Sequence, residues 1–572
     1  MAISSGNNWA VSGITSSDQV TDSPTNNFAT FIEVGSGMTL SEGNLKITTT
    51  STGWKVFPAS LRIPDTGKWV YKVSVIGDVS TSPGYAGDSA TGAGGAEYPM
   101  FKPWGVNAVA AGAMMGNFTT LYMGHGEIAA EVNESNSPQA GLTTLGTGDT
   151  CEVYLDNDAH TVKYYKNGSQ VGSTITGLNT LNYAFHMIYY SGSSITWDFG
   201  QHGFTRTDDT YNYISTANFP APAVSDGTAN FQTTLYTGNG SSRNIDQTGN
   251  STFQPDMVWI KNRDTTDEHK LIDATRGVQK KLNTDHYAVE ATESTGLTSF
   301  DSDGFGLGAG ANGYNDNTEK FVAWQWKAGG GSGSSNEDGS INTTTTSVNT
   351  AAGISIGTFT GTGSTATLGH GLGVVPKMII VKQRDTDSSD WIVYHAGNTS
   401  APQTDLLKLN ETNATADDNT AWNDTAPTST VFTIGTHAFT NPSSHTCVYY
   451  AFAEVEGFSR FSSYVGNGAA SLGPPVFCGF RPAFVMIKKA SGTGSWVMYD
   501  TQRSSFNEVD DQLHADATTA ETTGSEEIDF LATGFRIRTA DSDVNTSDGK
   551  YVYAAFASNP FGGDGVSPAT AV

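Results

Sequence analysis

Hydrophobic and polar residues alternate along most of the chain, in short stretches that glycine, proline and Asn-Gly pairs interrupt. Trp69, Tyr71 and Val73, for example, follow one another at every second position. A period of two places such side chains on one face of a β-strand. The Asn167-Gly168 pair, which lies between two later stretches, has the composition of a tight type I′ hairpin turn. Few stretches have the 3.6-residue period of an amphipathic helix, so the pattern predicts an all-β protein of short strands and tight turns.

Three motifs in the first part of the chain share a further pattern. They are KWVYKVSV (68–75), GDTCEVYLDNDAHTVKYYKNGSQVG (148–172) and ITWDFGQHGF (195–204). In this order they resemble the SPRY domain, which is a concanavalin-like β-sandwich. The resemblance implies a sandwich over residues 36–210 that binds or scaffolds and has no enzymatic activity.

The chain departs from the SPRY pattern between Tyr85 and Asn117, where a Gly/Ala-rich insertion replaces short loops. This insertion also contains Tyr98, Phe101 and Trp104. Aromatic residues are enriched where proteins contact one another, so these three residues are candidates for a contact loop. Packing of the insertion as filler against a neighbouring subunit is the alternative.

An internal repeat occupies the remainder of the chain. Each unit contains an apolar strand that follows a proline and ends at a lysine, and these strands are QPDMVWIKNRD (254–264), VPKMIIVKQRD (375–385) and RPAFVMIKKAS (481–491). The lysines Lys261, Lys382 and Lys488 are in register. Each unit closes with a second apolar strand, namely KFVAWQW (320–326), CVYYAFA (447–453) or KYVYAAFA (550–557). Each unit, such as the one at residues 228–328, has a length that is typical of a self-contained β-domain, so we expect three related β-sandwiches.

The sequence therefore predicts a multi-domain string of β-sandwiches. Its segments are an extended N-terminal arm (1–35), the SPRY-like sandwich (36–210), a linker (211–227), repeat 1 (228–328), a flexible Gly/Ser/Thr-rich linker (329–352), repeat 2 (353–459), repeat 3 (460–563) and a flexible tail (564–572). Pro24 excludes a helix from the arm, and Phe28 and Phe31 are available to dock it. Repeats 2 and 3 follow each other without a linker, so we expect them to pack rigidly.

The net charge of −27 narrows the choice of partners. Such a surface repels phosphate backbones, which argues against a nucleic-acid partner. No window approaches the 18 apolar residues of a membrane span, and the N-terminus lacks the basic and apolar regions of a secretory signal. The cysteines Cys151, Cys447 and Cys478 have no metal-like spacing and are expected to be small buried hydrophobes. We expect a soluble protein that is assembled in a cytoplasm.

Three acidic clusters, Asp264–Glu268, Asp301–Asp303 and Asp541–Asp543, are candidates for a calcium site. Calcium takes several oxygen ligands from a flexible loop, but none of the clusters matches an EF-hand, and plain turns are the alternative. No metal, cofactor-binding or catalytic residue is assigned, and we expect no enzymatic activity, because the chain has no GxSxG elbow, HExxH motif or phosphate-binding loop. The in-register lysines lie where strands end, which is a common place for a charge, and we assign them no binding role.

The strand FQPDMVWIKNRD (253–264), the closing FVAWQWKAGG (321–330) and the arm DQVTDSPTNNFAT (18–30) are similar to domains of predicted structural proteins of marine phages. This resemblance implies a virion protein, and we expect a tail fibre or adhesin that contributes to host attachment.

By the same resemblance, the arm is expected to bind other virion proteins. The sandwiches would contact host surface glycans or a receptor, through many weak contacts. Fibre proteins are usually trimers, so we expect a homotrimer. A capsid-decorating or head-fibre protein is one alternative. A polysaccharide depolymerase is another, and it would need two carboxylates that face each other in a groove.

Overall fold

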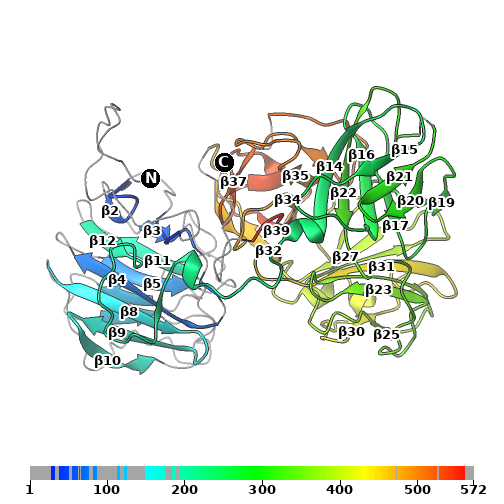
Figure 1. Cartoon of the computed structure of the whole chain (residues 1–572). Helices are drawn as coiled ribbons and strands as arrows, with labels where there is room; N and C mark the ends of the chain where they lie inside the picture. The colour runs from blue at the N-terminus through cyan, green and yellow to red at the C-terminus, as the bar shows by residue number, and fades with distance from the viewer. Residues whose placement is uncertain are drawn as a thin grey trace. The chain divides into compact units, whose positions relative to one another are not determined.

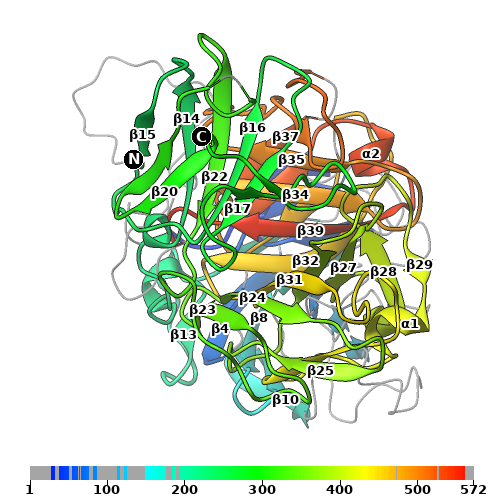
Figure 2. The same ribbon diagram turned by 90° about the vertical axis from the view of Figure 1, so that its right-hand side faces the viewer.

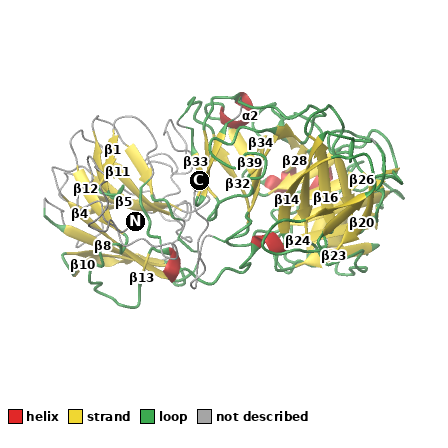
Figure 3. Ribbon diagram, turned by 45° about the horizontal axis from the view of Figure 1, so that its top comes forward, coloured by secondary structure: helices red, strands yellow, loops and turns green. Residues whose placement is uncertain are grey.

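The chain folds into two compact units in the computed structural model, unit 1 up to Pro222 and unit 2 from Ala223 to Pro560 (Figure 1). The structure describes residues 27–31, 38–49, 55–61, 63–64, 66–75, 81–86, 112–115, 121–124, 148–175, 183–188, 194–310, 312–471, 473–524 and 527–560. Strands make up nearly all of its regular structure (Figure 3), which confirms the expected all-β fold.

Helices are few and short in the described segments. They are α1 (Asn419–Trp422), α2 (Ser542–Asn545) and the 3-10 turns η3 (Thr216–Asn218), η4 (Gly227–Ala229) and η5 (Pro402–Thr404). In this part of the chain, no helix has the length and hydropathy that a membrane span requires.

Unit 1 contains two sheets. The larger has the order β1-β2-β12-β4-β8-β9-β10, with β13 paired in parallel to β4. Its strands are β1 (Met38–Ser41), β2 (Lys46–Thr49), β12 (Ser194–Asp198), β4 (Lys68–Val75), β8 (Thr150–Asp156), β9 (Thr161–Lys166), β10 (Ser169–Ile175) and β13 (Asn212–Tyr213). The smaller sheet consists, in order, of β3 (Lys55–Pro58), β11 (Tyr183–Ile188), β5 (Thr81–Ala86), β6 (Gly112–Met115) and β7 (Leu121–Gly124).

An aromatic cluster forms the core of unit 1. Trp69, Tyr71 and Val73 on β4 are buried, as their spacing predicts, and the ring of Tyr71 stacks on that of Trp197 with centroids 4.6 Å apart. Phe31 packs edge-on against Trp197 at 4.9 Å and is 1% exposed. Phe31 therefore belongs to this core, so the expected arm does not reach residue 35. Residues 1–26 lie outside the described residues.

The expected linker 211–227 begins inside unit 1. Tyr211 and Ile214 are buried, and the ring of Tyr211 packs edge-on against that of Tyr154 at 5.0 Å. The predicted start of the linker is wrong because these two apolar side chains need cover from water and find it against the larger sheet.

Unit 2 contains the three repeats, and each repeat is a sandwich of a larger and a smaller sheet. In repeat 1 the larger sheet consists of β14 (Phe231–Thr237), β22 (Lys320–Trp326), β16 (Met257–Asn262) and β17 (Lys270–Asp273), and the smaller of β15 (Arg243–Asp246), β21 (Gly304–Leu307) and β20 (Leu297–Asp301), with a hairpin of β18 (Lys280–Lys281) and β19 (Ala291–Thr292).

The other two repeats follow the same plan. Repeat 2 has β23 (Thr345–Asn349), β24 (Ile354–Thr360), β31 (Thr446–Phe452), β26 (Met378–Gln383), β27 (Trp391–His395), β28 (Asp405–Lys408) and β29 (Ala416–Asp417) in the larger sheet, and β25 (Ala366–Gly369) and β30 (Val431–Ile434) in the smaller. Repeat 3 has β32 (Ser459–Val465), β39 (Lys550–Phe556), β34 (Phe484–Lys489), β35 (Trp496–Asp500) and β36 (Leu513–His514) in the larger sheet, and β33 (Pro475–Phe477), β38 (Gly534–Ile537) and β37 (Ile528–Leu531) in the smaller.

The repeated strands pair in one register in all three repeats. The in-register lysine of each repeat lies opposite a valine of the closing strand, and the pairs are Lys261–Val322, Lys382–Val448 and Lys488–Val552. This common register identifies equivalent positions in the three repeats.

The three larger sheets share one hydrophobic core, which we call the axial core. Met257 and Trp259 on β16 enter it, whereas the alternate residues Val258 and Ile260 face the core inside repeat 1. Figure 2 shows the strands β22, β31 and β39 of the three larger sheets in one block. Both faces of each larger sheet are buried, which explains why the repeated strands are apolar at nearly every position. The repeats are sandwiches as predicted, but each packs against the other two.

The segment 329–352 is not the flexible linker that its composition suggests. β23 lies within it and pairs with β24 over five residues. At its start the fully buried carboxylate of Asp256 accepts backbone N–H groups from Ala328 (2.7 Å), Gly330 (2.9 Å) and Gly331 (2.6 Å). The prediction was wrong because the segment is held from outside: the carboxylate of Asp256 binds its start, and β24 pairs with β23. Its own side chains give little sign of these contacts.

Replacing Asp256 by alanine should release the start of this segment. Three backbone donors lose a charged acceptor, so we expect the free energy of unfolding of unit 2 to fall by about 2–4 kcal/mol. We also expect limited proteolysis to cut between residues 329 and 344 in Asp256→Ala but not in the unchanged chain. Asp256→Asn keeps one acceptor oxygen and should be intermediate. Equal cleavage of all three proteins would contradict the anchoring role.

Candidate functional site

The contact loop proposed from the sequence cannot be placed. Tyr98, Phe101 and Trp104 lie outside the described residues. The candidate sites considered below come from unit 2, where acidic, basic and aromatic side chains meet in and between the repeats.

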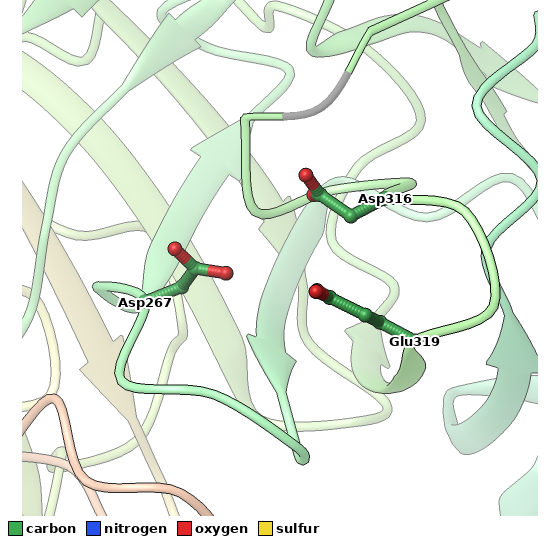
Figure 4. A group of neighbouring side chains, drawn as sticks. All are labelled: Asp267, Asp316 and Glu319. Carbon is green, nitrogen blue, oxygen red and sulfur yellow. The ribbon is translucent and has the colours of Figure 1, made fainter.

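Asp267, Asp316 and Glu319 form the group of acidic side chains in the described segments that has the spacing of a metal site (Figure 4). Their carboxylate oxygens lie within 4.8 Å of one another, and all three side chains are half-buried. Asp267 follows β16, whereas Asp316 and Glu319 precede β22, so the pairing of these two strands brings the carboxylates together. Of the three clusters proposed from the sequence, only Asp264–Glu268 contributes a residue.

A buried amide already serves this acidic group. The side-chain nitrogen of Asn262, which is 0% exposed, donates to Asp267 Oδ2 at 2.7 Å and to Glu319. Asp316 accepts the backbone N–H of Gly313 at 2.7 Å. A calcium ion needs six to eight oxygen ligands, and here an N–H donor points between two of the carboxylates. The group is therefore hydrogen-bonded as a turn rather than arranged as a finished cation site.

The other two acidic clusters are turns, as the alternative interpretation held. Gly304, with φ of 153°, closes the hairpin between β20 and β21 opposite Asp301. The carboxylate of Asp541 caps α2 by accepting the backbone N–H of Asp543 at 2.8 Å.

A fourth carboxylate in place of Asn262 should convert the acidic group into a cation-dependent one. In Asn262→Asp two donated hydrogen bonds become charge repulsions in a buried position, so we expect the melting temperature in chelator to fall by roughly 5 °C. Millimolar calcium should restore much of this loss, and it should change the unaltered protein little. Asn250→Asp adds the same charge at an exposed position and should show neither effect. A calcium-insensitive Asn262→Asp variant would contradict this account.

The in-register lysines are buried, contrary to their interpretation as ordinary charges at strand ends. Lys261, Lys382 and Lys488 are each 0% exposed, and burial lowers the pKa of each ammonium group to about 8. Lys382 donates to the backbone carbonyl of Tyr287 in repeat 1 at 3.3 Å, and Lys488 to that of Thr412 in repeat 2 at 2.8 Å. These two lysines connect repeats and present no surface charge to a polyanion.

A chain of buried and partly buried charges crosses the junction between repeats 1 and 2. Arg276 lies between Asp273 (2.5 Å) and Glu290 (3.2 Å), and Glu290 also pairs with Arg384 of repeat 2 at 2.9 Å. Burial lowers the pKa of Arg276, but the two carboxylates outweigh it and raise that pKa. Conversely, burial raises the pKa of Glu290, and the two arginines hold it below its usual value. Tyr450 of repeat 2 donates to Asp273 at 2.7 Å.

The junction between repeats 3 and 1 has the same chain of charges. Arg503 lies between Asp500 (2.6 Å) and Glu521 (3.1 Å), and Glu521 also pairs with Arg263 of repeat 1 at 2.6 Å. Trp324 of repeat 1 donates to Asp500 at 3.0 Å. This junction joins segments that are far apart in sequence, so the repeats form a closed cycle.

The junction between repeats 2 and 3 has neutral residues at the equivalent positions. His395 takes the place of Asp273 and Asp500. Each of the three lies opposite the first residue of the lysine-bearing strand of its repeat, which is β16, β26 or β34. Asn398 and Thr415 take the places of the arginine and the glutamate, and the Thr415 hydroxyl donates to Asn398 at 2.6 Å. Sequence analysis missed these chains, although the motif Asp-x-x-Arg, which begins at the last residue of β17 and of β35, is a visible signal for them.

Removing the shared carboxylate of the closing junction should destabilise unit 2. In Glu521→Gln the buried Arg503 and the partly buried Arg263 lose a charged partner, so we expect the free energy of unfolding to fall by about 3–5 kcal/mol. Urea denaturation of the full chain, followed by tryptophan fluorescence, measures it. Glu411→Gln breaks a more exposed pair with Lys408 and should lose less than about 1 kcal/mol. Equal losses in the two variants would refute the proposed importance of the buried chain.

Comparison with known proteins adds a family and a set of similar folds. A family model described as "Domain of unknown function (DUF7483)" matches residues 226–560, which is more than half of the chain and spans all three repeats. No curated protein matches the sequence.

Three solved structures with similar chains are SPRY domains. The TRIM65 PSpry domain is 12% identical, with a TM-score of 0.23, and the match covers 30% of this chain and 92% of that domain. A human SPRY domain is 14% identical, with a TM-score of 0.20 and coverage of 28% and 94%. The SPRY domain of human HERC1 is 17% identical, with a TM-score of 0.18 and coverage of 32% and 99%.

Proposed function

Because the chain belongs to the DUF7483 family, whose description states no activity, we propose a function from the chain's own residues. The protein is a non-catalytic structural protein of a bacteriophage particle, a tail fibre or adhesin that contributes to attachment to the host surface. The phage assignment rests on the resemblance of the repeated strands and the N-terminal segment to phage structural proteins.

The use of buried charge supports a structural role most directly. The charged groups between the repeats of unit 2 join the repeats to one another. Asp273, Arg276 and Glu290 do so between repeats 1 and 2, and Asp500, Arg503 and Glu521 between repeats 3 and 1. Catalytic acids and bases need access to a substrate and a pKa suited to proton transfer. A rigid block that presents surfaces is a more direct use of this arrangement than a reaction.

A role in attachment combines the block of three repeats in unit 2 with the SPRY-like unit 1. Unit 1 carries the SPRY-like motifs, which imply a binding surface, and the surface loops of the repeats are available for host glycans or a receptor. Weak contacts of this kind become effective when many copies act together on one particle. We propose a homotrimer whose contacts lie outside the repeat junctions, because the junctions are already filled within one chain.

Purified particles of a phage that encodes this sequence provide the test. We expect antibodies against the full chain to label the tail in electron micrographs, with tens of copies or fewer per particle on quantitative gels. We also expect the purified chain to compete with the phage for adsorption to host cells.

Three results would overturn the assignment in different ways. Labelling of the head, with hundreds of copies, would make the protein a capsid-decorating or head-fibre protein. Release of reducing ends from host polysaccharide by the purified chain would make it a depolymerase. Absence of the protein from purified particles would refute a virion function altogether.

A further inference from the structure

The junction between repeats 2 and 3 differs from the other two junctions at several equivalent positions. We call this junction the seam, and it comprises His395, Asn398 and Thr415 of repeat 2 with Tyr553 and Ala554 of repeat 3. The seam has no counterpart of the arginine–glutamate chain that crosses each of the other junctions. The bonds that cross it go to backbone carbonyls instead, such as those that Lys488 Nζ and the Gly494 N–H donate to Thr412 at 2.8 and 2.9 Å.

The seam also has a small side chain where the other two junctions have a large one. The position of Ala554 is occupied by Trp324 in repeat 1 and by Tyr450 in repeat 2, as the strand registers show. Trp324 and Tyr450 each donate a hydrogen bond across their junction, which alanine cannot do. A cavity of about 30 Å³ in the axial core is lined by Ala554 together with residues of all three repeats, including Trp391 and Phe484.

A buried polar group at the seam lacks a partner. The side-chain nitrogen of Asn398, a residue that is 1% exposed, has no hydrogen-bond partner among the described residues. At the equivalent positions the guanidinium groups of Arg276 and Arg503 reach two carboxylates each. An unpaired buried donor destabilises the closed arrangement.

His395 closes the seam in its neutral form. Its Nδ1 accepts the backbone N–H of Gly397 at 3.1 Å, so Nε2 carries the proton and donates to the carbonyl of Tyr553 in repeat 3 at 3.1 Å. A second proton on the ring would sit on Nδ1, where it would point at the backbone N–H of Gly397, so two donors would face each other. The elements packed around β27 carry the charged groups Lys382 on β26, Asp405 and Lys408 on β28, Lys550 on β39, and Lys377 just before β26. Of these, Lys550 acts on the ring, and its charge also lowers the pKa of His395.

The connection between repeats 2 and 3 is short and keeps them together when the seam opens. β31 ends at Phe452 and β32 begins at Ser459, so a short turn that contains Gly457 (φ 75°) joins the two repeats. The other two junctions, which hold repeat 1 to its neighbours, retain their buried charges. Unit 2 can therefore open on one side and remain one body.

We propose that the seam is an acid-sensitive opening in the cycle of repeats, held shut by neutral His395. Below the ordinary pKa of histidine, an opened seam takes up a proton on His395 that the closed seam excludes. Burial lowers the pKa of His395 in the closed form from 6.5 to about 4. Opening therefore becomes more favourable as the pH falls from about 6.5 towards 4, and the effect levels off below that range.

Hydrogen–deuterium exchange of the full chain at pH 7 and pH 5, corrected for the intrinsic exchange rates, tests this proposal. The backbone N–H groups of Thr415 and Gly494 donate across the seam to Ala490 and Thr412, so we expect protection to fall roughly twentyfold at pH 5 in peptides that contain these two amides. The amides of Glu290 and Glu521, which cross the other two junctions, should keep their protection. Loss of protection at all three junctions together, or first at Glu521, would overturn the proposal.

Two variants separate the role of His395 from general acid unfolding. His395→Gln keeps a neutral donor towards Tyr553 and cannot titrate, so its seam should show the same protection at pH 7 and pH 5. Ala554→Val fills part of the cavity and should raise seam protection at both pH values while keeping the pH dependence. A twentyfold loss at pH 5 in His395→Gln would refute the role of this histidine, even if the seam still opened.

Discussion

Burial of both faces of the larger sheets is the constraint on which unit 2 depends. One face of each sheet closes a sandwich within its own repeat, and the other enters the axial core that all three repeats share. Apolar burial stabilises by about 25 cal/mol per Å², and a sheet that is buried twice gains it on both faces. A single repeat would expose Met257, Trp259 and their equivalents to water. The three repeats therefore form one structural unit, in agreement with a family model that spans all of them.

The double burial also decides where charge can lie. A charge that is removed from water needs a partner or a hydrogen-bonded cage, and the lysines at the ends of the repeated strands use backbone carbonyls for this purpose. In each Asp–Arg–Glu chain the carboxylates and the arginines are partners for one another. Lys382, Lys488 and the Asp–Arg–Glu chains draw partners from a neighbouring repeat. Groups that would be unfavourable in an isolated repeat therefore help to specify how the repeats pack together.

The asymmetry of the cycle has a physical logic. Repeats 2 and 3 are joined by a few residues, which keeps their faces at a high effective concentration. Repeats 1 and 2 are joined through the longer segment that contains β23, and repeats 3 and 1 have no direct connection. The buried charge chains lie at these two junctions, and the neutral one lies where the covalent connection is shortest. Asp256 belongs to the same logic, because only repeat 1 is followed by a long segment that must be held in place.

Period-two alternation and the Gly-rich turns determined the all-β fold, because side-chain direction in a strand depends only on local geometry. The in-register lysines and closing strands likewise determined the number of repeats. The structure adds that these two strands pair, with Lys261 opposite Val322 and the equivalent pairs in the other repeats. The boundaries of the domains were harder to predict from the sequence, because Phe31 and Tyr211 lie in largely polar segments and only the folded structure shows that a sheet covers them. Only the tertiary structure decided that the repeats close into a cycle, that the segment 329–352 is held, and that the lysines are buried. Each of these depends on contacts between residues far apart in the chain, and composition and periodicity do not encode such contacts.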